Sequence, residues 1–218
     1  MRARAHPPQT SVTPKPLRIA AVAAAALAAL ALGIFTASRL SAPRAAPQLA
    51  SGTALGEPRP VAAFTLTDHD GQPYTQAQLQ GRWTLLFAGF THCPDVCPTT
   101  LALMAQLRRQ LAAGPERLEL LFLSVDPDRD TPEQLKRYTA HFGAGIRGVT
   151  APAAPLDAFC SSLGLAYVKV PGARAGDYTV DHSAALVLLD PRGRIAAYFP
   201  PPHRLDTLAA DLGRIMGT

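Results

Sequence analysis

Residues 83–101 read WTLLFAGFTHCPDVCPTTL, and this stretch decides how the chain should fold. The run Trp83–Phe90 is continuously apolar and of strand length, which is typical of a central strand buried on both faces. Pro98 suits the first position of a helix, and apolar side chains recur after it at helical spacing as far as residue 111. Cys93 and Cys97 therefore belong to a junction between a strand and a helix, which is where ligands bind in an open α/β sheet.

The two cysteines, separated by three residues, are the most informative pair chemically. We expect Cys97 at the helix cap and Cys93 in the loop before it. Because the N-terminus of a helix lowers the pKa of a nearby thiol, both sulfurs are expected to be more nucleophilic than a free cysteine. Two close thiolates can form a redox-active disulfide or bind a soft metal ion. A static disulfide, or two inert buried thiols, is the structural alternative.

Strand-like and helix-like runs alternate over the rest of the domain. A short hairpin (64–75) precedes the central strand, and a tight turn at 191–193 joins the last two strands. Between and around them the sequence predicts helix 98–111, strand 118–125, helix 131–142, strand 146–150, helix 155–163, strands 184–189 and 194–199, and helix 203–216. This order predicts an α/β protein, a thioredoxin-like three-layer sandwich with a mixed sheet and an N-terminal hairpin. The flavodoxin-like alternative would not end in a hairpin.

A third metal ligand can be sought among the six histidines. His182 lies in DYTVDHSAALVLL (177–189), just before a predicted core strand, and in a thioredoxin-like sheet this segment would lie beside the cysteine loop. Asp181 or another oxygen could orient its second ring nitrogen. His92 is adjacent to Cys93, and adjacent side chains usually point apart, so His92 is a weaker candidate. From position alone, a purely structural role for His182 stays open.

An apolar run without charged residues, Ile19–Ala37, lies near the N-terminus. As a helix it would be roughly 28 Å long, close to the ~30 Å hydrocarbon core of a bilayer, so it predicts one transmembrane anchor at 19–37. Basic residues before it favour a cytoplasmic tail at 1–18 and export of the rest of the chain. Residues 38–56 are small, contain proline and lack acidic groups, which predicts a flexible linker to a domain at 57–218. The expected location is the bacterial inner membrane, crossed once, with the domain in the periplasm; cleavage as a signal peptide is the alternative.

Charge and cysteine content exclude two classes of protein. Six of the 21 Lys and Arg residues lie in residues 1–56, which contain no Asp or Glu, so the rest of the chain is nearly neutral. The formal charge of +5 thus belongs to the N-terminal segment and predicts no nucleic-acid-binding surface. Three cysteines in 218 residues likewise exclude a small domain stapled by disulfides.

Three motifs together, FTHCPDVCPTTL, SVDPDRDTP and DYTVDHSAALVLLDPRGRI, closely resemble the Sco/SenC family in their order and spacing. The resemblance covers the chain from about Glu57 to the C-terminus. Members of that family are membrane-tethered, thioredoxin-like copper proteins that help to assemble cytochrome c oxidase. Their CxxxC cysteines and the histidine of their DH motif bind copper, which implies Cys93, Cys97 and His182 as ligands here. Two thiolates and one imidazole suit Cu(I) and, with a weak further ligand, Cu(II).

The resemblance implies a metallochaperone, rather than an enzyme, that delivers copper to or matures the binuclear copper centre of cytochrome c oxidase. Its expected partners are the copper-bearing subunit of that oxidase, another periplasmic copper chaperone or a thiol reductant, and the inner membrane. The alternative is a thiol–disulfide reductase that keeps the cysteines of that subunit reduced through Cys93 and Cys97, for which His182 would be dispensable. A peroxiredoxin-like peroxidase shares the fold, but the residues before Cys93 lack its cysteine pattern.

Two further features lie outside the three predicted ligands. Cys160 is an extra thiol, expected to be a small core residue on a helix. Asp126, Asp128 and Asp130 follow a predicted strand, where turn and helix-cap roles are expected; a role near the metal or at a partner surface is the alternative.

Overall fold

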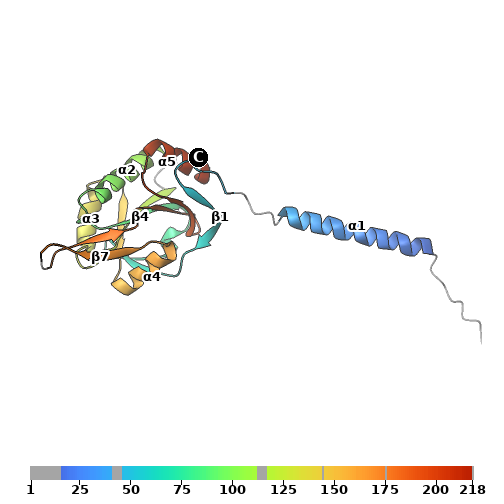
Figure 1. The fold of residues 1–218 in the computed structure, drawn as a ribbon, viewed down its shortest axis with the longest axis horizontal. Helices are drawn as coiled ribbons and strands as arrows, with labels where there is room; N and C mark the ends of the chain where they lie inside the picture. The colour runs from blue at the N-terminus through green and yellow to red at the C-terminus, as the bar shows by residue number, and fades with distance from the viewer. Residues whose placement is uncertain (1–15, 41–45, 112–116, 144, 175, 218) are drawn as a thin grey trace, which may run out of the picture. The chain divides into compact units, whose positions relative to one another are not determined.

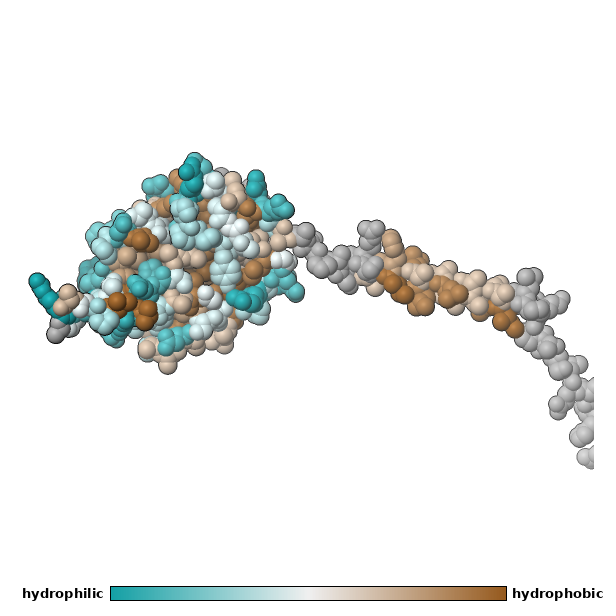
Figure 2. All heavy atoms as spheres, viewed as in Figure 1, coloured by the Kyte–Doolittle hydropathy of each residue, from teal (hydrophilic) through white to brown (hydrophobic). Residues whose placement is uncertain are grey.

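The computed structural model describes residues 16–40, 46–111, 117–143, 145–174 and 176–217. The chain divides into two units, Met1–Pro43 and Arg44–Thr218. The first unit contains helix α1 (Pro16–Leu40), drawn in blue in Figure 1. Its segment Ile19–Ala37 is long and apolar enough to cross a membrane, and Figure 2 shows hydrophobic surface along it. Residues 1–15 of the expected tail and 41–45 of the expected linker lie outside the described residues.

The second unit is built on a mixed sheet of eight strands in the order β1-β10-β9-β4-β5-β6-β2-β3. Strand β4 (Trp83–Gly89) lies inside this sheet, parallel to β5 (Leu118–Ser124) and antiparallel to β9 (Leu186–Leu189). The other strands are β1 (Thr53–Pro60), β2 (Thr65–Asp68), β3 (Pro73–Thr75), β6 (Ile146–Thr150) and β10 (Arg194–Phe199). The mixed sheet and the N-terminal hairpin, β2–β3, were both predicted from the sequence.

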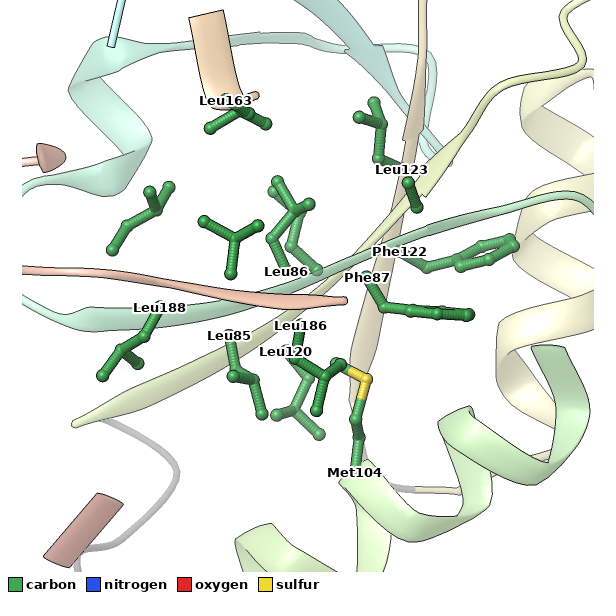
Figure 3. Packing of buried hydrophobic residues seen from close by; sticks show 14 of the residues in the cluster. Leu85, Leu86, Phe87, Met104, Leu120, Phe122, Leu123, Leu163, Leu186 and Leu188 are labelled. Carbon is green, nitrogen blue, oxygen red and sulfur yellow. The ribbon is translucent and has the colours of Figure 1, made fainter. Parts of the chain in front are cut away.

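Helices cover both faces of the sheet and complete the three layers. They are α2 (Val96–Gln110), α3 (Pro132–Ala140), α4 (Ala153–Leu163) and α5 (Leu205–Met216), with a short 3-10 helix, η1 (Gln76–Leu79). Figure 3 shows Met104 of α2 reaching Leu120 on one face, while Leu163 of α4 lies on the other. The ring of Tyr138, in α3, lies 5.6 Å from that of Phe122, so α3 covers the same face as α2.

The core sits where the continuous apolar runs predicted it. Every residue of β5, and every residue of β4 after Trp83, is buried. Burial of each large aliphatic or aromatic side chain contributes roughly 1.5–3 kcal/mol, so these two strands hold the sheet together and provide a rigid base for the loops at their carboxyl ends.

Two parts of the unit differ from the sequence expectation. Strand β1 begins at Thr53 and pairs with β10, and the N–H groups of Ala50 and Ser51 donate to the carboxylate of Asp211 at 3.0 and 2.7 Å. The expected linker at 38–56 therefore ends earlier, because this backbone finds partners on the folded unit. Strands β7 (Tyr167–Pro171) and β8 (Tyr178–His182) were also not expected, and they form a separate two-stranded sheet, seen at the label β7 in Figure 1.

Candidate metal centre

The cysteine loop connects the end of β4 to helix α2. This helix begins at Val96, so Cys97 is its second residue and Pro98 its third, which corrects the expectation that Cys97 caps the helix. Proline fits there because the N–H groups of the first turn have no partner within the helix. The N–H of Cys97 donates to the sulfur of Cys93 at 3.4 Å. Cys97 is buried, whereas Cys93 is partly exposed; both are free thiols.

Gly89, the last residue of β4, leaves room for the Cys97 sulfur because it has no side chain. The sulfur approaches the strand where any other residue would carry a Cβ atom. We did not identify Gly89 from the sequence, although a glycine inside an apolar strand run is a signal for close approach of another group.

His182 is the last residue of β8. Its Nε2 atom lies 3.6 Å from the Cys97 sulfur, and its ring stands edge-on to Phe87 and Phe90, at 5.8 and 6.0 Å between ring centroids. Its Nδ1 atom lies 3.2 Å from the carbonyl oxygen of Ser183, so this carbonyl, rather than Asp181, is placed to accept the ring proton. Such a hydrogen bond leaves the Nε2 lone pair facing the sulfur.

Burial determines the protonation of both inner groups. It lowers the pKa of His182 below the usual histidine value, against smaller raising effects of the Ser183 carbonyl and Asp181, so the imidazole is neutral at neutral pH. It raises the pKa of the Cys97 thiol far above its usual value, despite a backbone hydrogen bond that acts in the opposite direction. The expectation that the helix N-terminus makes Cys97 more nucleophilic is therefore wrong, because desolvation outweighs the dipole. A metal ion would have to displace this proton on binding.

The three predicted ligands converge. The sulfurs of Cys93 and Cys97 and a ring nitrogen of His182 all lie within 4.8 Å of one another. A metal–sulfur bond is about 2.3 Å long, so two thiolates on opposite sides of one ion would lie about 4.6 Å apart. The separations between the three donor atoms are close to this value or shorter, so one ion could contact all three groups with little rearrangement. Two sulfurs and one imidazole are a ligand set for a soft or borderline transition metal.

The acidic residues after β5 support the loops around this site. The carboxylate of Asp130 is buried and accepts hydrogen bonds from the N–H and hydroxyl of Thr91 and from the hydroxyl of Ser124, at 2.6–2.9 Å. The buried carboxylate of Asp126 accepts from the hydroxyl of Tyr178 at 2.7 Å and from Arg129. Asp128 is exposed and pairs with Lys169. These contacts are structural, but the side chains join distant segments rather than cap a helix, as was expected for them; the cap of α3 is Thr131.

Two other sequence candidates lie outside the cluster of three donors. His92 is exposed, and its Nδ1 atom lies 3.8 Å from the carboxylate of Asp130. It could share a metal ion only with the carboxylates of Asp126 and Asp130. Both carboxylates already accept the hydrogen bonds described above, so few of their lone pairs are free for an ion. Cys160 is 2% exposed and lies in the core on α4, as predicted.

Comparison with known proteins bears on both the fold and the site. The copper-bound structure of ScoI from Bradyrhizobium japonicum has a TM-score of 0.65 and 37% identity, over 71% of this chain and 98% of that one. BsSco, described as a member of the Sco family of cytochrome c oxidase assembly proteins with a disulfide switch, has a TM-score of 0.61 and 26% identity, over 76% of this chain and 96% of that one. These matches confirm the predicted thioredoxin-like fold.

Sequence relatives agree with these structures. A putative copper-binding protein of Stutzerimonas stutzeri is 41% identical over 159 residues, 72% of this chain and 78% of its own length. The matched segment makes up 54–60% of the length of the mammalian mitochondrial SCO1 and SCO2 homologs. The SCO1/SenC family model matches residues 53–217. The chain therefore belongs to the SCO1/SenC family.

Proposed function

We propose that this chain is a membrane-anchored copper-binding protein that delivers copper to, or matures, the binuclear copper centre of cytochrome c oxidase. Cys93, Cys97 and His182 hold the metal, as Cu(I) and as Cu(II). The observation that carries the proposal is the convergence of two sulfurs and one imidazole nitrogen within 4.8 Å, from a loop, a helix and a separate two-stranded sheet. Copper in its two oxidation states prefers soft sulfur and imidazole nitrogen, respectively, and this set contains both.

The membership in the SCO1/SenC family supports this proposal. Copper is bound in the Bradyrhizobium structure, and assembly of cytochrome c oxidase is the process in which the family of BsSco takes part. Copper here is cargo rather than a resident cofactor. The copper-bearing oxidase subunit would be the recipient, and another periplasmic chaperone would be the donor.

Metal analysis of the full chain tests the proposal. The reduced protein, purified in detergent without oxygen, is expected to bind one copper ion per chain. Cys93→Ser and Cys97→Ser should each lose tight binding of both oxidation states, whereas Cys160→Ser, a change of a cysteine outside the cluster, should bind like the parent. Two or more tightly bound ions, or none, would contradict the proposal.

A thiol–disulfide reductase is the second candidate, and one contact favours it. The N–H of Cys97 donates to the sulfur of Cys93, and the two sulfurs lie within 4.8 Å of each other, so the pair is placed to close into a disulfide after a small movement. In this function the pair would reduce the cysteines of the oxidase subunit, a thiol reductant would regenerate it, and His182 would contribute nothing to the chemistry.

A further inference from the structure

The sheet that carries His182 shares no strand pairing with the main sheet among the described strands. Strands β7 and β8 pair only with each other among the described strands, in a register that places Tyr167 opposite His182. Backbone pairing therefore fixes His182 relative to β7 and not relative to the cysteine loop. The chain rejoins the main sheet at Leu186 of β9, four residues after His182. Side-chain contacts must supply the rest of the positioning.

Arg129 makes contacts that join this small sheet to the end of β5, beside the ion pair of Lys169, in β7, with Asp128. Its guanidinium lies over the ring of Tyr178, the first residue of β8, at 3.7 Å from the ring centroid, and its Nη1 atom donates to the Tyr178 carbonyl oxygen at 3.1 Å. The same guanidinium also lies 5.8 Å from the ring centroid of Phe90. A planar guanidinium can donate in its plane and stack on its faces at once, which an ammonium group cannot do.

Asp126 holds Arg129 in this place. One carboxylate oxygen accepts from the Nε of Arg129, and the other accepts from the Tyr178 hydroxyl at 2.7 Å. The carboxylate is fully buried, and the turn that carries it is closed by hydrogen bonds from the N–H groups of Arg129 and Asp130 to the Asp126 carbonyl. The three side chains Asp126, Arg129 and Tyr178 thus form a closed ring of contacts between the end of β5 and the start of β8.

Phe90 extends these contacts to both sides of the metal centre. Its ring stands edge-on to that of His182, and its carbonyl oxygen accepts from the N–H of Cys93 at 3.2 Å. Arg129 therefore touches the strand that carries the imidazole, through Tyr178, and the aromatic ring between the imidazole and the cysteine loop.

We infer that Arg129 is a positioning residue for His182. Locked by Asp126, its guanidinium holds β8 against Phe90 and so keeps the imidazole nitrogen beside the Cys97 sulfur. Arg129 does not touch the donors itself. This inference rests on the proposed function only in so far as copper is the ion bound; the positioning of His182 is a property of the metal-free chain and can be measured without metal.

The first measurement is amide hydrogen exchange of the full chain in detergent, reduced and free of metal. Arg129→Gln should raise exchange at residues 178–182 about tenfold and leave β4 and β5 unchanged. Arg129→Lys keeps the charge but loses the planar contacts, so it should not restore protection. Arg137→Gln, which removes an exposed arginine of α3 whose partner is Gln134, is the matched control and should change nothing.

The second measurement is spectroscopic. After loading with Cu(II), Arg129→Gln should show a weaker imidazole-nitrogen signal in electron spin echo spectra and bind Cu(II) about tenfold less tightly, while Cu(I) affinity, set by the two thiolates, changes less than about threefold. Tyr178→Phe keeps the ring and the carbonyl but loses the hydrogen bond to Asp126, so its exchange should lie between those of the parent and Arg129→Gln.

Parent-like exchange at residues 178–182 in Arg129→Gln would overturn the inference. An increase in exchange that is equally large in β4 and β5 would also overturn it, because Arg129 would then stabilise the whole domain rather than position β8. Parent-like Cu(II) spectra would overturn it as well. If the parent chain bound no copper while exchange at 178–182 rose as expected, the proposed function would fail and the positioning of His182 would stand.

Discussion

A Cβ atom on Gly89 would lie 2.8 Å from the sulfur of Cys97 and 2.8 Å from the ring of Phe122. Both distances are shorter than ordinary contacts between non-bonded atoms. The strand that forms the centre of the sheet therefore ends in a glycine because the sulfur and the aromatic ring occupy the space of a side chain.

Gly89→Ala should weaken copper binding and destabilise the domain by about 1–3 kcal/mol, because the sulfur and the ring must both move. Competition with a Cu(I) chelator and urea unfolding would measure the two effects. Gly148→Ala is a suitable control: its Cβ would meet Leu135 at 3.0 Å, so it should cost stability without affecting copper. Equal copper affinity in Gly89→Ala and the parent would show that the sulfur does not need this space.

His182→Ala distinguishes copper handling from thiol reduction. The two remaining thiolates still suit Cu(I), whereas Cu(II) prefers nitrogen and more ligands, so the variant should keep much of its Cu(I) and lose the sulfur-to-Cu(II) charge-transfer absorption. Cys93 and Cys97 should still form a disulfide. In cells, oxidase activity should be lost; if it survives in His182→Ala but not in the cysteine variants, the reductase candidate is the correct one.

Asp211 on α5 holds the N-terminal end of the domain, and its contribution should depend on pH. Burial acts to raise the pKa of Asp211, but hydrogen bonds from the hydroxyl and N–H of Ser51 and the N–H of Ala50, together with Arg214, lower it overall. The ionised form is therefore favoured in the folded state. Its stabilisation is fully present above the ordinary aspartate pKa of about 3.9 and is lost as the pH falls through the lower pKa of the folded state.

Asp211→Asn should accordingly lower the free energy of unfolding at pH 7 by about 1–3 kcal/mol, and the difference from the parent should shrink below about pH 4. Urea unfolding at pH 7 and pH 3 would measure it. Asp206→Asn, a change in the first turn of the same helix, is the control and should have a smaller effect. A difference that does not vary with pH would contradict the role of the ionised carboxylate.

Cys160 should be inert. Burial raises the pKa of its thiol to about 12, with a smaller effect of Asp157, so almost no thiolate is present at neutral pH. Alkylating reagents should modify Cys160 only after denaturant is added, as mass spectrometry of labelled peptides would show. Rapid labelling of the native protein at this residue would mean that α4 opens readily.

The chain should stay anchored with its domain in the periplasm. Alkaline phosphatase fused after Thr218 should be active in a bacterial host, because the basic residues precede the apolar segment of α1, and the same fusion without residues 19–37 should be inactive. A mature N-terminus after Ala37 would show a cleaved signal peptide instead of an anchor.

The parts of the fold that were predicted correctly are those whose local sequence agrees with their final environment. The apolar runs at β4 and β5 are strands, and β6 lies at the predicted residues 146–150. Helix α3 begins at Pro132, one residue after the predicted start, with the Thr131 hydroxyl oxygen accepting from the N–H of Gln134 at 3.2 Å. The sheet β7–β8 was missed because half of its residues are exposed and it has no apolar run; Val168 is 57% exposed. Strand β1 was missed because Pro58 and Pro60 are unfavourable in strands, and only the edge position beside β10 accommodates them.

The candidate site was predictable in its ligand types but not in its electrostatics. The spacing of Cys93 and Cys97 and the motif around His182 identified the three donors that the structure brings together. The protonation of Cys97 depends on burial, which arises from packing across the sheet and is not encoded in the spacing of the pair. The contacts of Arg129 with Tyr178 join residues 49 positions apart, so no local pattern could indicate them.

The unequal burial of the two sulfurs would set the order of ligand exchange in the transfer that we propose. Cys97 is 0% exposed, while Cys93 faces solvent in part. In the proposed transfer, an incoming thiolate from another protein would meet Cys93 before Cys97, because the Cys93 sulfur is the more accessible of the two; Cys93 would then be the first sulfur replaced and Cys97 the last. Copper bound at this centre would then enter and leave past the accessible sulfur, with the buried sulfur as its innermost thiolate ligand.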